Sequence, residues 1–380
     1  MPLSTAPRRV LLGAAALGCA FTLGFVGCDV ASDGELDARA EAPAEARPDT
    51  AALPLALPTG NIALLTGDLP GFYMEVDRDT IRGLRRAGWE GGQYGFVRGP
   101  VGAGADRRFV QLHEGVDIRP LHRDEAGEPL DVVRAARAGT VAYVNDAAGS
   151  AFGRYVVVEH DWGGSPVYTL YAHLADVAVA EGERVGRSAP LGRLGYTGRG
   201  IWRERAHVHF EVAMMLNEHA PAWFANYYAG QPDLHGRFFG TNLAGVDVPA
   251  LFAALVERPD LTFQQFVQSR PAGYRVALPG DRPLDVLRRY PWLWEGEAPP
   301  RPGDGAWEVT FTAEGVPMGV SWSPRAVAAP EVVWTDPRVL AKQCQTNGML
   351  ARAGGRCVPS GQGRRYFALL ATTADGAPHW

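Results

Sequence analysis

The stretch that decides the fold is His207-Val208-His209-Phe210-Glu211-Val212. Polar and apolar side chains alternate along it, and a β-strand sends successive side chains to opposite faces. The alternation therefore predicts a strand with His207, His209 and Glu211 on one face. The apolar face is expected to meet a core, which leaves the polar face for chemistry.

Runs of strand-forming residues also occur upstream of this stretch. They are 139–144, 153–159 and 167–171. The last run follows the turn residues 163–166, an arrangement that is typical of a β-hairpin. Because no helix is predicted between these strands, we expect an antiparallel sheet folded on itself over about Arg108 to Val212.

A second polar motif precedes these runs: His113-Glu114-Gly115-Val116-Asp117. Its histidine and aspartate are four residues apart, a spacing that would place both on one face of a helix. Gly115, Val116 and Ile118 disfavour a helix. We therefore expect a tight turn that enters a strand, with both polar side chains converging.

The two motifs supply the ligand types that zinc accepts, which are imidazole nitrogen and carboxylate oxygen. A catalytic zinc site uses three protein ligands and leaves one position for water. His113, Asp117 and His209 form such a set, which predicts one Zn²⁺ per chain.

Two further histidines lie outside this ligand set. His173 belongs to the segment 171–174, and His207 begins the strand motif. A neutral imidazole can accept the proton of a water near pH 7, and a protonated one can stabilise an oxyanion. We therefore expect His173 and His207 to be catalytic. An HxxxD or HxH motif alone is more often structural than metal-binding, so the prediction depends on their conjunction.

The ordered motifs resemble the M23 family of zinc metallopeptidases, the lysostaphin and LytM type that cut peptidoglycan cross-bridges. The segments that carry the resemblance are 113–118, 138–141, 171–174, 182–185, 191–192, 195–198 and 207–211. The resemblance as a whole covers about Tyr94 to Val212. The family usually has a glycine near the position of Ser188.

The resemblance implies a mainly β fold with an antiparallel, LytM-like peptidase core. Carried over residue by residue, it implies the same ligands (His113, Asp117 and His209) and the same catalytic histidines (His173 and His207). The expected function is a zinc endopeptidase that hydrolyses peptide stems or cross-links of peptidoglycan. Two alternatives remain: a non-catalytic regulator that binds the wall or activates amidases, and a peptidase that acts on exported proteins.

The first residues are typical of an export signal. Arg8 and Arg9 precede an apolar run that ends at Cys28. The residues before Cys28 resemble the lipobox of bacterial lipoproteins, in which the cysteine is lipidated, and Cys19 is a second candidate. A twin-arginine signal and an uncleaved anchor are further alternatives. We expect an exported lipoprotein that is anchored to a membrane of the cell envelope and faces the periplasm.

We divide the chain into five parts. They are a signal peptide with lipobox (1–28), a disordered Ala/Pro/acidic linker (29–58), a lead-in segment (59–105), the M23-like core (106–216) and an appended α+β region of unknown role (217–380). The linker has too few apolar residues to offset its ordering entropy, so we expect an extended tether. In the last part, 248–256, 263–268 and 283–292 predict helices, and 307–312 and 366–372 predict strands.

Composition and the remaining cysteines limit the partners. The net charge of −5 argues against non-specific binding of nucleic acid. Peptidoglycan peptides and a membrane are the expected partners, and the sequence leaves the oligomeric state open. Cys344 and Cys357 are close in sequence and would pair in an oxidising compartment, which would stabilise the fold by about 3 kcal/mol. Two unlinked thiols are the alternative.

Overall fold

The computed structural model describes residues 52–75, 88–102 and 108–380. The predicted signal peptide, Cys28 and most of the predicted linker lie outside these residues. Among the helices of the described part, none is both long and apolar enough to span a bilayer.

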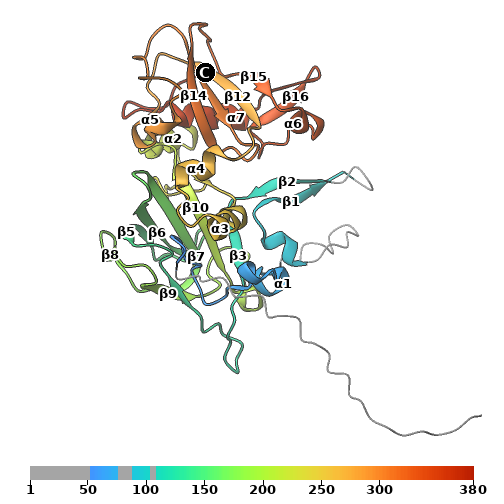
Figure 1. Ribbon diagram of the computed structural model, residues 1–380, viewed down its shortest axis with the longest axis vertical. Coiled ribbons are helices and arrows are strands. Elements are labelled where there is room, and N and C mark those ends of the chain that lie inside the picture. The colour runs from blue at the N-terminus through green and yellow to red at the C-terminus, as the bar shows by residue number, and fades with distance from the viewer. Residues whose placement is uncertain (1–51, 76–87, 103–107) are drawn as a thin grey trace, which may run out of the picture. The chain divides into compact units, whose positions relative to one another are not determined.

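The centre of the fold is a nine-stranded sheet in which every paired strand is antiparallel. Its strands are β3 (Val116–Ile118), β4 (Val132–Arg134), β5 (Gly139–Asn145), β6 (Arg154–Asp161), β7 (Pro166–Val177), β8 (Arg184–Val185), β9 (Pro190–Leu194), β10 (Val208–Met215) and β11 (Leu243–Gly245). Its main path runs β11-β10-β7-β6-β5-β8, while β3 pairs with β10 and β9 pairs with β4 and β7. The prediction of a mainly β, antiparallel core is confirmed (Figure 1).

Strand β10 is the strand predicted from the alternating motif, and its neighbours set the site. Its residue His209 stands opposite Asp117 of β3 and opposite Ala172 of β7. The backbone register alone therefore places two predicted ligands side by side.

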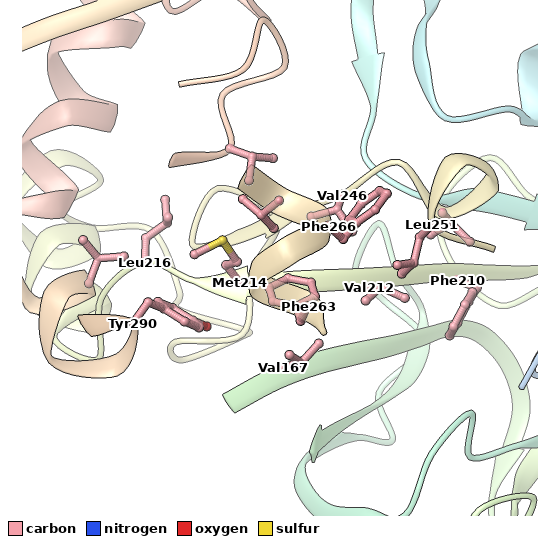
Figure 2. Packing of buried hydrophobic residues seen from close by; sticks show 14 of the residues in the cluster. Val167, Phe210, Val212, Met214, Leu216, Val246, Leu251, Phe263, Phe266 and Tyr290 are labelled. Atoms are coloured by element: carbon pink, nitrogen blue, oxygen red, sulfur yellow. The ribbon is translucent and has the colours of Figure 1, made fainter. Parts of the chain in front are cut away.

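The apolar face of β10 is covered by two helices, α3 (Val248–Glu257) and α4 (Phe263–Gln268). Figure 2 shows side chains of β10 meeting Leu251 of α3 together with Phe263 and Phe266 of α4. Asp247 caps α3, and Thr262 forms a capping box with Gln265 at the start of α4, which fixes where both helices begin. Both faces of β10 are consequently buried.

The lead-in segment also packs against the core. It forms η1 (Ala63–Thr66), α1 (Leu69–Phe72), η2 (Gly88–Gly92) and β1 (Gly95–Val101), and β1 pairs with β2 (Arg108–His113). The linker prediction is wrong for residues 52–58, because Leu53 and Leu55 are buried and Ala56 N donates to Ala136 O. Burial of these two leucines compensates for ordering this short segment.

The C-terminal part contains a second antiparallel sheet of order β14-β13-β12-β15. These strands are β12 (Tyr274–Pro279), β13 (Ala306–Phe311), β14 (Pro317–Ser323) and β15 (Glu331–Thr335). The other elements are α2 (Ala220–Tyr227), α5 (Asp285–Arg289), η5 (Pro291–Leu293), α6 (Pro337–Ala341), β16 (Leu350–Ala353), β17 (Arg356–Pro359) and α7 (Gly361–Leu370). The domain boundary predicted at 216/217 does not coincide with the end of the peptidase sheet. Strand β11, which lies beyond this boundary, pairs with β10 and belongs to that sheet.

One predicted strand and the predicted disulfide lie in this part. Residues 366–372 were predicted as a strand, but most of them form α7, so this prediction is wrong. Ser360 caps the helix by accepting a hydrogen bond from Gly363 N, and the Ala-Leu-Leu run that follows favours a helix. Cys344 and Cys357 are joined in the predicted disulfide.

Candidate metal centre

Three side chains from three strands meet at one point. His113 ends β2, Asp117 is in the middle of β3, and His209 is the second residue of β10. His113 Nε2 lies 3.0 Å from His209 Nδ1 and 3.1 Å from Asp117 Oδ1, and the latter two atoms are 3.0 Å apart. All three residues are buried. The expected turn into a strand at 113–117 is therefore observed.

This triangle fits a small divalent cation. A metal held at about 2.0–2.1 Å from three tetrahedral ligands separates the ligand atoms by about 3.3 Å. The three observed separations are slightly shorter. Two imidazoles and one carboxylate also match the donor set of catalytic zinc sites.

Hydrogen bonds at the rear orient both ligand imidazoles. His113 Nδ1 lies 2.7 Å from the carbonyl of Gln93, to which it donates, so Nε2 keeps its lone pair for the centre. His209 is turned the other way, with Nε2 2.7 Å from Glu211 Oε1 and Nδ1 facing the centre. Each histidine thus turns one ring nitrogen toward the same point, His113 with Nε2 and His209 with Nδ1.

The two remaining histidines border this triangle. Their Nδ1 atoms lie near backbone carbonyls, at 2.8 Å for His173 and Thr197 O and at 2.6 Å for His207 and Arg205 O. Each Nε2 is thereby left as the proton-accepting nitrogen, and that of His207 is 3.5 Å from Asp117 Oδ1. The rings of His173 and His207 are 4.7 Å apart. The three predicted ligands and the two predicted catalytic histidines are therefore gathered in one place.

The backbone at His173 is unusual. Its φ is 65°, in the left-handed region that non-glycine residues rarely adopt. The strained conformation is held by two hydrogen bonds, one from His173 N to Phe152 O and one between its ring and Thr197 O. Strain that persists at one histidine of a polar cluster is typical of a functional site.

Burial and mutual charge shift the proton affinities of the site. Burial lowers the pKa of His113 to about 4, and it also lowers the pKa values of His173 and His207. Burial opposes charge on His209 too, but its hydrogen bonds to Asp117 and Glu211 raise its pKa to about 9.

The carboxyl of Asp117 remains ionised. Burial alone would raise its pKa, but electrostatic interactions with His113 first, and then with His207 and Arg98, hold the pKa well below its usual range.

Three contributors to the site were missed by the sequence prediction. Arg98 of β1 places Nη2 2.5 Å from Asp117 Oδ2, on the side of the carboxylate away from the triangle. Gln93 supplies the carbonyl behind His113, and Glu211 supplies the carboxylate behind His209. Only Glu211 had a signal, because the same alternation places it on the face of His209.

Two glycines are required where segments approach closely. A Cβ at Gly115 would lie 2.5 Å from Phe210 O and 2.8 Å from Glu211 Cγ. Gly198 has a φ of 106°, and a Cβ there would lie 2.7 Å from Ala151 O. Substitution at either position would therefore displace backbone at the site.

Ser188, where the family usually has glycine, also adopts a left-handed backbone, with a φ of 67°. The turn conformation is thus kept without glycine, at some energetic cost.

A second group has the same kinds of ligand atoms close together. Glu218, His219 and Asp285 offer atoms that lie within 4.8 Å of one another. Both carboxylates are already paired with arginines: Arg288 Nη2 lies 2.6 Å from Glu218 Oε2, and Arg289 pairs with Asp285 and Glu218. This second group is therefore best described as a salt-bridge network.

Comparison with known proteins assigns the segment that carries His113, Asp117 and His209 to a family. The sequence profile of peptidase family M23 matches residues 111–221. No curated protein matches the chain at a significant level.

Similar solved structures include two catalytic domains and one larger peptidase. The catalytic domain of the prophage-encoded M23 protein EnpA from Enterococcus faecalis is 21% identical, and the alignment covers 32% of this chain and 76% of that chain with a TM-score of 0.23. The catalytic domain of the antimicrobial peptidase lysostaphin from Staphylococcus simulans is 22% identical, with coverage of 32% and 76% and a TM-score of 0.23. A zinc-containing peptidase from Vibrio cholerae is 26% identical, with coverage of 37% and 36% and a TM-score of 0.22. The profile match spans the segments that carry both ligand motifs, so residues 111–221 of this chain are a peptidase M23 domain.

Proposed function

We propose that this protein is a zinc-dependent endopeptidase that hydrolyses peptide stems or cross-links of peptidoglycan. The observation that carries the proposal is the convergence of three ligand atoms, mutually 3.0–3.1 Å apart, beside two further histidines. Membership of the domain in peptidase family M23 supports the reaction class and the choice of metal.

The residues that would hold the zinc are His113, Asp117 and His209. When bound, the metal would supply a Lewis acid and lower the pKa of a water to about 7. Arg98 and Glu211 orient the ligands from behind, so that Asp117 Oδ1 and His209 Nδ1 face the metal position. Burial of the three ligands and of Glu211 excludes bulk water, which strengthens their electrostatic interactions.

His173 and His207 would manage the proton and the developing charge. Both are neutral near pH 7, because burial lowers their pKa values, and both hold their proton on Nδ1 against a carbonyl. Each Nε2 can therefore accept a proton from the attacking water. Once protonated, the same nitrogen can hydrogen-bond to the oxyanion of the tetrahedral intermediate or donate to the leaving amine.

The site favours an enzyme over a regulator. A regulator that only binds the wall needs neither catalytic histidine, yet both are present, with their tautomers fixed by backbone carbonyls. A peptidase that acts on exported proteins would use the same chemistry, so only the substrate distinguishes it.

The location follows from the N-terminal sequence. We propose export and anchorage to a membrane of the cell envelope through lipid on Cys28, with residues 29–51 as the tether toward the wall. Mass spectrometry of the N-terminal peptide from the mature protein tests this proposal. A Cys28→Ala protein that stays in the membrane fraction would contradict it.

The enzymatic proposal is tested with purified zinc-loaded protein and defined muropeptides. Mass spectrometry should detect new cleavage products, which should disappear with chelator and return with zinc. Unfolded exported proteins serve as the competing substrate class. Stoichiometric binding of muropeptides without turnover would favour the regulator, and cleavage of the proteins alone would favour the third alternative.

A further inference from the structure

The loop that joins β9 to β10 carries an exposed tryptophan. Trp202 is 51% exposed, and within the described residues Trp334, at 42%, is the one other aromatic side chain that is largely exposed. A single exposed apolar side chain is ordinary on a protein surface. The meaning of Trp202 therefore depends on where it lies and on what holds it there.

The loop begins and ends at the two histidines that border the metal centre. The carbonyl of Thr197 lies 2.8 Å from His173 Nδ1. The carbonyl of Arg205 lies 2.6 Å from His207 Nδ1. Trp202 is one turn before Arg205, because Arg205 N donates to Trp202 O at 2.8 Å. Such a turn brings the two Cα atoms within about 7 Å of each other. Trp202 therefore lies at the edge of the metal centre.

The backbone beside Trp202 is held by a side chain from another segment. Arg123 Nη1 donates to Arg203 O at 2.9 Å, and Arg123 Nη2 donates to Glu204 O at 3.4 Å. These two carbonyls belong to the residues that directly follow Trp202. The loop therefore presents the indole from a fixed backbone.

The guanidinium of Arg205 supports one face of the indole. Its Cζ lies 4.9 Å from the ring centroid of Trp202, and its Nη1 donates to Gly200 O at 3.2 Å. A cation over an aromatic face is attracted to it, which favours one orientation of the ring. Because Arg205 covers one face and half of the side chain is exposed, the opposite face is available to a ligand.

We propose that the open face of Trp202 stacks against a sugar ring of the glycan to which the stem peptide is attached, so that sugar-bearing stems are preferred over free peptides. A pyranose ring has C–H bonds on its face and hydroxyl groups at its edge. The C–H face packs on an aromatic ring, and the edge needs polar partners. Arg203 and Glu204, which are 44% and 66% exposed, supply such groups directly beside Trp202.

This assignment rests on the proposed function, because the sugar is taken to be part of a peptidoglycan substrate. An extended peptide advances about 3.5 Å per residue. A sugar on Trp202 and a scissile bond at the metal centre are therefore separated by only a few residues. The bond that is cleaved accordingly belongs to the stem peptide near the glycan, rather than to a distant cross-link.

Binding of the sugar alone is tested with the zinc-loaded full chain and chitotriose, an oligosaccharide of N-acetylglucosamine that contains no peptide to cleave. NMR titration should show that Trp202→Ala binds chitotriose about tenfold more weakly than the parent, the effect of losing one stacked ring. Trp202→Tyr keeps an aromatic face and should retain most of the affinity. Trp334→Ala removes the other exposed indole and should bind as the parent does. Equal affinity in the parent and in Trp202→Ala, or no binding by the parent, overturns the proposal.

A second arm joins the sugar contact to catalysis. A disaccharide-bearing stem peptide and the same peptide without sugar are compared by kcat and KM. The parent should have the lower KM for the sugar-bearing substrate, and Trp202→Ala should raise that KM to the value for the free peptide. A merely structural role of Trp202 would instead disturb the carbonyl behind His207 and lower kcat for both substrates.

The outcomes separate the sugar contact from the proposed function. If the parent cleaves both substrates with equal kcat/KM, the sugar assignment fails and the proposed function stands. If Trp202→Ala raises KM equally for both, the indole contacts the peptide and the sugar assignment fails. If chitotriose binding depends on Trp202 but no wall peptide is cleaved, the proposed function fails and the sugar contact stands.

Discussion

Two groups of side chains in this protein bring metal-ligand atoms within 4.8 Å of one another, yet their surroundings differ. His113, Asp117 and His209 are buried, and both imidazoles are oriented by an acceptor at the rear. Glu218, His219 and Asp285 are half-buried, and two arginines neutralise the two carboxylates. The ligand atoms of the first group face one common point, whereas both carboxylates of the second group are already paired with arginines.

The difference teaches that proximity alone does not make a metal site. Ligands must offer unprotonated, correctly directed atoms, and the residues behind them decide this. A cation approaching Glu218 and Asp285 would have to displace Arg288 and Arg289.

The largest effect is expected from deleting a ligand of the first group. His113→Ala should abolish zinc retention and lower muropeptide cleavage about a thousandfold or more, because several kcal/mol of metal stabilisation are lost. Metal analysis after dialysis and a rate assay measure both effects.

His219→Ala is the matched control in the second group and should retain one zinc and full activity. Loss of zinc from this variant would show that the second group, too, binds the metal.

The next effect concerns a histidine that borders the triangle without belonging to it. His173→Gln should lower kcat about 10²- to 10⁴-fold, the usual contribution of general acid–base catalysis, while zinc content stays at one per chain. The exposed His122→Gln should change neither quantity. Unaltered turnover in His173→Gln would remove this residue from the mechanism.

A smaller effect is expected at a contact behind a ligand. Glu211→Gln removes the carboxylate that orients His209 and should weaken zinc binding about 10- to 100-fold. Competition with a chromophoric chelator measures the affinity. Glu159→Gln, an exposed position on β6, provides the control. Equal affinity in both variants would mean that Asp117 alone fixes the ring.

The smallest effect contrasts the site with a histidine that serves only packing. His160 is buried between Ala138 O and Thr169 Oγ1, and burial lowers its pKa to about 4. The unfolded chain takes up this proton below about pH 6.5 while the folded chain does not, so stability falls as the pH drops from about 6.5 to 4.

His160→Gln should flatten this slope by at most about 1.4 kcal/mol per pH unit. Denaturant unfolding at several pH values, with zinc present throughout, measures the slope. A variant whose free energy of unfolding follows the pH exactly as the parent does would contradict the assignment. Loss of the contact with Thr169 would lower the free energy of unfolding by the same amount at every pH. The dependence of that free energy on pH can therefore still be compared between variant and parent.

The ligands and the two bordering histidines were predictable from the sequence because their motifs combine strand alternation with a recognisable order. Arg98 was not, since it reaches the site through pairing between two strands. The helix at 361–370 was missed because a short apolar run is compatible with both the helical and the strand periodicity. Only the N-terminal cap at Ser360 distinguishes the helix from a strand. The burial of Leu53 and Leu55 was also missed, because the segment around them is rich in Ala and Pro and was therefore predicted to be disordered.

The packing behind β10 has a practical consequence for anyone who wishes to use this peptidase as a module. A fragment trimmed to the family limits, 111–221, would lose β11, α3 and α4. The apolar face of strand β10, which includes Val212 and Met214, would then be exposed to solvent. An exposed apolar surface of this kind favours aggregation of the fragment. The limits of the family match are therefore not the limits of a folding unit. A fragment that keeps the apolar face of β10 covered would have to extend at least through residue 268, where α4 ends.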